Sequence, residues 1–79
     1  MNGSKNSITV KMKKSIAKSL RRLRAEKDIS LKTASEKIGM SKTYLHMLEQ
    51  QKVKNPTLGD LQKIAKYYRV KISFLIGEI

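Results

Sequence analysis

The sequence of 79 residues predicts an all-α fold, a compact bundle of five short helices that forms one small domain. Apolar residues recur at steps of three and four along most of the chain, which is the period of a helix that buries one face. Residues that favour helix N-caps precede four of the expected helices, and no strand hairpin is indicated. These N-caps are Ser30, Ser41, Thr57 and Ser73.

Residues 1–10 are polar, contain Gly, Ser and Asn and lack a helical period, which predicts a flexible basic N-terminal arm. The folded domain is expected over 11–79. Its first helix, from about residue 11 to residue 27, has one apolar stripe, and its other faces are rich in lysine and arginine. The stripe consists of Met12, Ile16, Leu20 and Leu23, and the helix is expected to end near Asp28.

A short helix over 31–38 is expected next, with Ser30 as its N-cap. Small residues at Ala34 and Ser35 lie on its inner face, so that another helix can cross it closely. Gly39 supplies the left-handed turn that ends this helix without steric cost.

A further helix over 42–50 begins after Ser41, and Met40 is expected to act as an apolar plug before it. Leu45 and Leu48 face inward. The outward face carries groups that can bond to base edges or phosphates, if the partner is a nucleic acid. The outward residues are Lys42, Thr43, His46, Met47 and Gln50.

Thr57 is expected to cap a fourth helix, after a loop over 51–57 in which Pro56 disfavours helical geometry at the residue before it. Ser73 is expected to cap one last turn. The buried stripe of the fourth helix is expected to comprise Leu58, Leu61, Ile64, Ala65 and Tyr68. The apolar residues of the last turn are Leu75 and Ile76.

The chain is strongly basic, with 18 Lys and Arg against 6 Asp and Glu, a net charge of +12 and a pI near 10.3. Nucleic acid and anionic membrane are the partners that this balance favours, and a solvated basic surface is the plain alternative. The sequence has no cysteine, one histidine, no Gly-rich phosphate loop and no convergent pair of carboxylates. We therefore expect no enzyme activity, no metal and no cofactor.

The chain resembles the Cro/C1-type, or xenobiotic-response-element (XRE), helix-turn-helix family, which includes phage repressors. The resemblance covers about residues 15–78. It rests on matches at fixed spacing, namely Leu23-Arg24, Gly39, Glu49, Asn55-Pro56-Thr57, Leu61, Ile64-Ala65, Val70 and Leu75. It implies a lambda-repressor-like helix-turn-helix bundle. In three places the chain departs from the family. Leu31 stands where a phosphate-binding Gln is common, and Ala34-Ser35 stands where Leu-Ala is common. Gln51 stands where a Gly often follows the recognition helix, so the loop is expected to leave differently.

The resemblance also implies roles for individual residues on double-stranded DNA. The side chains implied to read base edges are Lys42, Thr43 and Met47, and core packing is the alternative for Met47. The side chains implied near the DNA backbone are Ser30, Lys32, Ser41, Tyr44, His46, Lys52 and Lys54. The alternative for Tyr44 is packing against the edge of the first helix. A largely buried ion pair between Arg24 and Glu49 is implied to orient the recognition helix.

The function implied is a transcriptional regulator of a bacterium, phage or mobile element, expected to act in the cytoplasm at the nucleoid. It is expected to repress by occupying a pseudo-palindromic operator as a homodimer, with a protein antagonist as a possible further partner. The main alternative is a protein-binding module of antitoxin or antirepressor-partner type, with Phe74, Ile76 and Ile79 as its exposed apolar residues. A membrane-surface helix and an RNA-binding domain fit the sequence less well, because the globular pattern covers 30–76 and aromatic residues are few.

Overall fold

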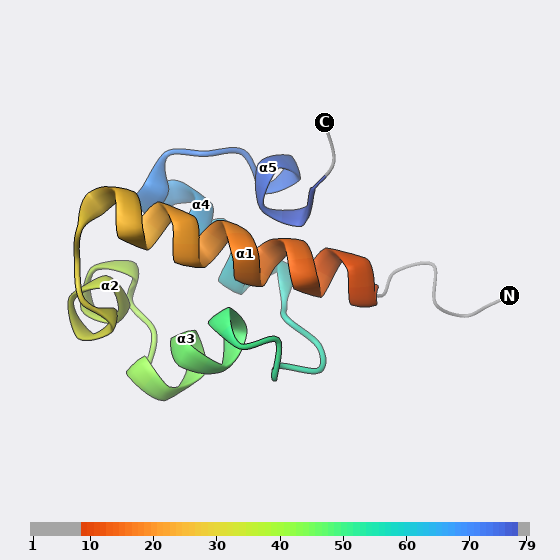
Figure 1. Ribbon diagram of the computed structural model, residues 1–79, viewed down its shortest axis with the longest axis horizontal. Helices are drawn as coiled ribbons and strands as arrows, with labels where there is room; N and C mark the ends of the chain where they lie inside the picture. Colours follow the sequence, from red (N-terminus) through yellow and green to blue (C-terminus); the bar gives the residue numbers. More distant parts are fainter. Residues whose placement is uncertain (1–8, 78–79) are drawn as a thin grey trace, which may run out of the picture.

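A computed structural model describes residues 9–77 and confirms the all-α prediction, with five helices and no strand in this part of the chain. Figure 1 shows α1 lying across the bundle, with α2 and α3 on one side of it, α5 on the other, and α4 behind it. The helices are α1 (Val10–Lys27), α2 (Leu31–Ile38), α3 (Lys42–Glu49), α4 (Leu58–Tyr68) and α5 (Ile72–Ile76).

The first helix begins earlier than the sequence predicted. Thr9 is its N-cap, with a side chain that accepts a hydrogen bond of 3.1 Å from the backbone N–H of Met12, and Val10 is the first helical residue. The expectation that 9 and 10 belong to an arm is therefore wrong, because a threonine hydroxyl satisfies an otherwise unpaired donor of the first turn. Residues 1–8, which carry the rest of the predicted arm, lie outside the described residues.

One hydrophobic core joins all five helices. Six large aliphatic side chains at its centre are 1% exposed or less, and burial of each contributes about 1.5–3 kcal/mol. They are Ile16, Leu20, Leu45, Leu61, Ile64 and Leu75. Since Leu45 belongs to α3 and Ile16 and Leu20 to α1, the core fixes the recognition helix directly on the longest helix of the bundle.

The α2–turn–α3 unit has the geometry expected from its small residues. Ala34 is completely buried and Ser35 is 3% exposed, so the backbones of the two helices approach closely here. The buried hydroxyl of Ser35 donates to the carbonyl of Lys32, so this buried side-chain oxygen is not left unpaired in the crossing. Gly39 ends α2 in the left-handed region, with φ of 89°.

Two expectations for the last helices are wrong. Leu58, predicted to be buried, is 62% exposed because it is the first residue of α4 and side chains of a helix point toward its N-terminus, beyond the core. The last turn begins at Ile72, after the extended Lys71, so Ser73 lies inside α5 and caps nothing. Among the described residues, no helix is both long and apolar enough to cross a membrane.

Candidate nucleic-acid interface

The recognition helix α3 has one buried and one exposed side. Leu45 and Leu48 point into the core, and the side chains of Lys42, Thr43 and His46 are exposed on the opposite side. Two further residues predicted to face DNA are intermediate: Met47 and Tyr44 are half-buried and pack against the core. The exposed side of α3 thus presents an ammonium group, a hydroxyl and an imidazole, which are groups that bond to bases and phosphates.

A shallow groove of about 370 Å³ separates the start of α2 from the exposed side of α3. Its lining residues are Leu31, Lys42, Thr43 and His46, and none of them is acidic. Leu31 is half-buried and forms the apolar wall of this groove, in the position where the family often has a phosphate-binding glutamine. The groove therefore combines one positive charge with an apolar surface and has no carboxylate to repel a phosphate.

Both helices that border the groove begin there. Ser30 and Ser41 cap α2 and α3, and each side-chain oxygen accepts a hydrogen bond of 3.0 Å from the third backbone N–H of its helix. Other N–H groups of each first turn have no partner within the helix, and neither first turn contains an acidic residue. Helix N-termini of this kind attract anions through unpaired N–H groups and the helix dipole.

Tyr44 connects α3 to α4. Its hydroxyl donates a hydrogen bond to the carboxylate of Asp60, and burial, followed by this hydrogen bond, raises the pKa of Tyr44 to about 12. The hydroxyl stays protonated at neutral pH and is already engaged inside the protein. The hydrogen-bond partner of Tyr44 thus lies on α4, and packing of its ring against the edge of the first helix stays an alternative.

The loop after α3 is held at both ends. Gln51 adopts the left-handed conformation, with φ of 61°. Glycine adopts this conformation easily, so Gln51 takes the backbone conformation that suits the glycine often found here in the family. Val53 is buried, and the carbonyl of Lys54 accepts a hydrogen bond of 2.9 Å from the ammonium of Lys13 on α1. Lys52 and Lys54 remain exposed on a loop whose course is fixed.

Arg24 and Glu49 form a bidentate ion pair between α1 and α3. Arg24 Nε lies 2.9 Å from one carboxylate oxygen of Glu49 and Arg24 Nη2 lies 3.0 Å from the other. The Glu49 side chain is 2% exposed and that of Arg24 is 28% exposed. The hydrogen bond to Glu49 raises the pKa of Arg24, so the guanidinium is permanently charged.

Sequence reasoning missed two groups that hold the recognition helix. Arg21 donates to the backbone carbonyl of Glu49, and Asp60, in the first turn of α4, accepts from Tyr44. The position of Arg21 three residues before Arg24 was the available signal, because such pairs share one face of a helix. No group of three potential metal ligands occurs among residues 9–77.

The comparisons with known proteins agree with this geometry. The helix-turn-helix family HTH_3 matches residues 20–75, which include α2, the turn and α3. The HTH-type transcriptional regulator SinR of Bacillus licheniformis is 32% identical over 63 residues, which cover 80% of this chain and 57% of SinR. The chain thus spans a little more than half the length of this curated relative.

Two crystal structures extend the similarity to three dimensions. An HTH_3 family transcriptional regulator from Vibrio cholerae has a TM-score of 0.76 and 31% identity, over 86% of this chain and 38% of that one. SinR, described as the master regulator for biofilm formation and crystallised in complex with DNA, has a TM-score of 0.71 and 32% identity, over 76% of this chain and 95% of that one. The family resemblance predicted from the sequence is confirmed: this chain belongs to the helix-turn-helix family.

Proposed function

We propose that this chain is a sequence-specific, double-stranded DNA-binding transcriptional regulator that reads the major groove with α3. The observation that carries the proposal is the exposed side of α3, where Lys42, Thr43 and His46 stand beside the two helix N-termini at one groove. An α-helix fits the major groove of B-DNA, and its N-terminal half faces the bases in this family of motifs. The SinR structure in complex with DNA supports the same use for a protein of similar fold and 32% identity.

Base reading is assigned to the first half of α3. Lys42 donates to guanine O6 and N7, and Thr43 contacts a thymine methyl group. Met47 is half-buried, so one part of its side chain packs against the core and the exposed part contacts a base. His46 lies on the same exposed side, closer to the sugar-phosphate wall.

Phosphate contacts are assigned to groups at the rim of the reading surface. They supply affinity without sequence preference and fix the protein on the duplex. Ser30, Ser41 and Tyr44 act at the helix starts, and the hydroxyl proton of Tyr44 is already donated to Asp60. The lysines in this role are Lys32, Lys52 and Lys54, all exposed.

The regulator acts as a repressor at the nucleoid, by occupying a pseudo-palindromic operator as a homodimer whose half-sites lie ~10 bp or a multiple apart. It performs no chemistry of its own. Phe74 on α5 is 44% exposed and supports a twofold contact between subunits or the docking of a protein antagonist. Of the other two residues predicted for this surface, Ile76 is half-buried and Ile79 lies outside the described residues.

Selection of bound duplexes from a random library tests the proposal. The expected result is enrichment of one motif with twofold symmetry, and Lys42→Ala should relax the preference at one position of each half-site. Lys63→Ala on α4, which also removes one exposed positive charge, is the matched control and should select the unchanged motif. Recovery of duplexes with no common motif would reject sequence-specific binding.

A further inference from the structure

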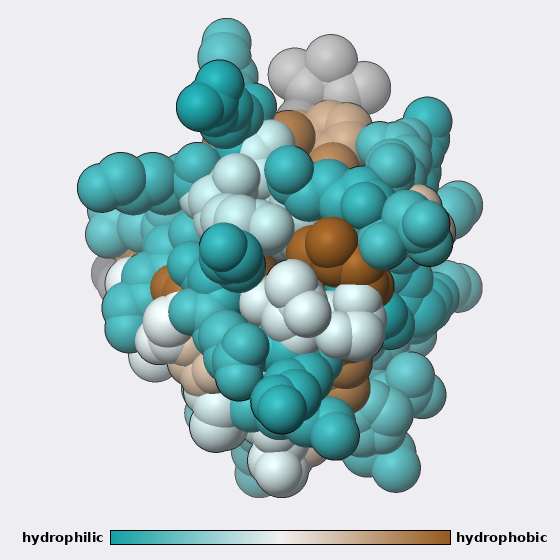
Figure 2. Space-filling view, turned by 90° about the vertical axis from the view of Figure 1, so that its left-hand side faces the viewer, coloured by the Kyte–Doolittle hydropathy of each residue, from teal (hydrophilic) through white to brown (hydrophobic). Residues whose placement is uncertain are grey.

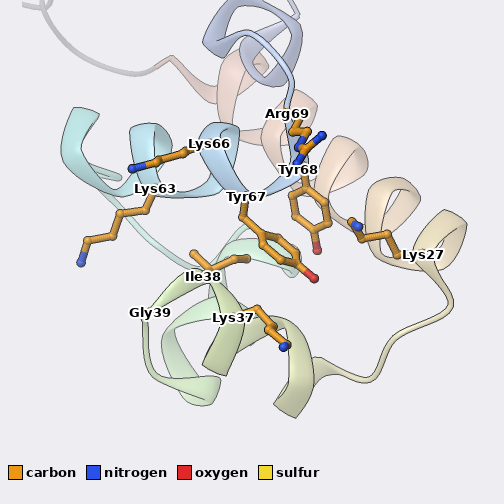
Figure 3. Close-up of a pocket in the computed structure, with 9 residues that line it drawn as sticks. All are labelled: Lys27, Lys37, Ile38, Gly39, Lys63, Lys66, Tyr67, Tyr68 and Arg69. Atoms are coloured by element: carbon orange, nitrogen blue, oxygen red, sulfur yellow. The ribbon is translucent and has the colours of Figure 1, made fainter.

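A second and larger cavity, of about 880 Å³, lies at the end of the molecule where α2, α4 and α1 all terminate (Figure 3). It shares no lining residue with the groove beside α3. Figure 2 shows this end of the molecule, where hydrophilic side chains cover most of the surface around small apolar patches. The volume lies within the ~300–1,000 Å³ range that small-molecule sites occupy in proteins.

The charge of this cavity is entirely positive. Five of its nine lining residues are cations, none is acidic, and none of the five forms an ion pair within residues 9–77. Like charges that share one concave surface repel each other and attract anions from solution. The cations are Lys27, Lys37, Lys63, Lys66 and Arg69.

Two tyrosines make part of this cavity a fixed hydrogen-bonding surface. The ring of Tyr67 lies 4.9 Å from the ring of Tyr68, edge to face, and the ammonium of Lys27 lies 5.2 Å from the centre of the Tyr67 ring. Figure 3 shows both hydroxyls pointing into the space toward Lys27 and Lys37. Burial raises the pKa of Tyr68 to about 12, so its hydroxyl keeps the proton that it can donate.

The cations lie on different sides of the cavity. Figure 3 shows the ammonium groups of Lys63 and Lys66 on the opposite side of the cavity from those of Lys27 and Lys37, with Ile38 between them. A single phosphate held beside one of these clusters leaves the charge of the other cluster unmatched. A chain of linked phosphates can contact the hydroxyls and ammonium groups of one cluster and extend toward the other.

We propose that this cavity binds a linear polyphosphate group, either inorganic or attached to a nucleoside. Lys27, Lys37 and the hydroxyls of Tyr67 and Tyr68 hold one end of the phosphate chain, and Lys63 and Lys66 attract the other. The site is independent of the surface that reads DNA, so a ligand can occupy it on the free protein.

Amide chemical shifts of the full chain test the proposal without DNA. Sodium tripolyphosphate and ATP are titrated at constant ionic strength, with orthophosphate as the reference. Both polyphosphates should give saturable shifts at Gly39 and Arg69 and should bind roughly tenfold more tightly than orthophosphate, because several charge-assisted hydrogen bonds replace one or two. Tighter binding of ATP than of tripolyphosphate would identify the nucleoside-linked form as the ligand, and equal binding the phosphate chain alone.

Matched variants separate a built site from general positive charge. Lys27→Gln combined with Lys37→Gln should weaken tripolyphosphate binding roughly tenfold, since each lost ammonium removes a charge-assisted contact. Lys14→Gln combined with Lys18→Gln removes the same charge from exposed positions of α1 outside the cavity and should leave the affinity unchanged.

Three kinds of result would overturn the proposal. The first kind is a sign of ionic screening, either shifts that do not saturate or equal losses of affinity in both double variants. The second is tighter binding of a polyglutamate peptide than of tripolyphosphate, which would make the cavity a site for an acidic protein segment. The third is a response of the cavity amides to duplex DNA but not to tripolyphosphate, which would make the cavity a second DNA surface.

Discussion

The two sides of α3 are built from different chemistry and are held by different neighbours. The inner side is fixed by Leu45 and Leu48 in the core and by the ion pair of Glu49 with Arg24. The outer side carries exposed Lys42 and the other polar groups of the groove and makes little contact with the rest of the domain. A helix arranged in this way separates two properties: the inner side governs where the helix lies, and the outer side governs what it reads.

Glu49→Ala should have the largest effect on stability, because it removes the ion pair that holds the inner side of α3. It leaves the Arg24 guanidinium without its partner at the edge of the core, so the free energy of unfolding should fall by about 3 kcal/mol. Urea denaturation followed by circular dichroism measures this loss. Glu26→Ala removes the exposed i,i+4 pair with Arg22 on the same α1 helix and should change stability little. Equal losses in the two variants would contradict the structural role assigned to the buried pair.

Lys42→Ala should affect only the outer side. The free energy of unfolding should stay unchanged, and binding to the preferred operator should weaken by about 1–3 kcal/mol, with the loss confined to one base position. Met47→Ala sharpens the comparison, because loss of this half-buried side chain should reduce both the free energy of unfolding and the base preference. Titration of operator duplexes substituted at single positions provides the measurement. A loss for Lys42→Ala that is the same on every sequence would reassign this residue to the phosphates.

The loop lysines should contribute to affinity without contributing to base preference. With ~4–6 phosphate contacts per subunit, the logarithm of the binding constant should fall with the logarithm of salt at a slope of about −0.9 per contact. Lys54→Ala should weaken binding to all sequences alike and reduce this slope by about 0.9. Fluorescence anisotropy over a range of KCl concentrations tests both expectations. A nearly flat salt dependence would refute the electrostatic part of the proposal.

High pH should lower the free energy of unfolding through Tyr44, whose hydroxyl joins α3 to α4. The folded pKa of Tyr44 is about 12 against an ordinary 10.0, so the unfolded chain loses this proton first and stability should decrease as pH rises from 10.0 toward about 12. Tyr44→Phe should show a smaller decrease over this range and should be less stable by about 1 kcal/mol at neutral pH, because Asp60 loses its donor. Urea midpoints measured at several pH values test this. Identical pH profiles for the two proteins would contradict it.

The elements could be predicted from the sequence because their signals are local. The caps at Ser30, Ser41 and Thr57, the small pair before Gly39 and the apolar period predict helix bounds within one or two residues of those observed. Where these signals fail, the reason is tertiary or positional. Leu58 fits the apolar period of α4 yet is exposed, because a side chain at the first position of a helix projects past its end.

The candidate site was predictable in part. The exposure of Lys42 and Thr43 follows from the helical period once Leu45 and Leu48 are placed inside. The hydrogen bond from Tyr44 to Asp60 could not be predicted, because it joins residues on two helices whose crossing depends on the whole core. The cation cavity likewise gathers residues from three helices, and no spacing along the chain indicates that their ends meet.

The hydrogen bond from the Lys13 ammonium to the Lys54 carbonyl has a practical consequence for fusions to this domain. It fastens the first turns of α1 to the loop that carries the proposed phosphate contacts, so the start of the folded domain lies beside that loop. The last helix, α5, lies across α1 from α3 (Figure 1). A fluorophore or affinity tag joined after α5 is therefore kept away from α3, but it follows directly on the proposed subunit contact at Phe74, so its effect on dimerisation is to be measured first.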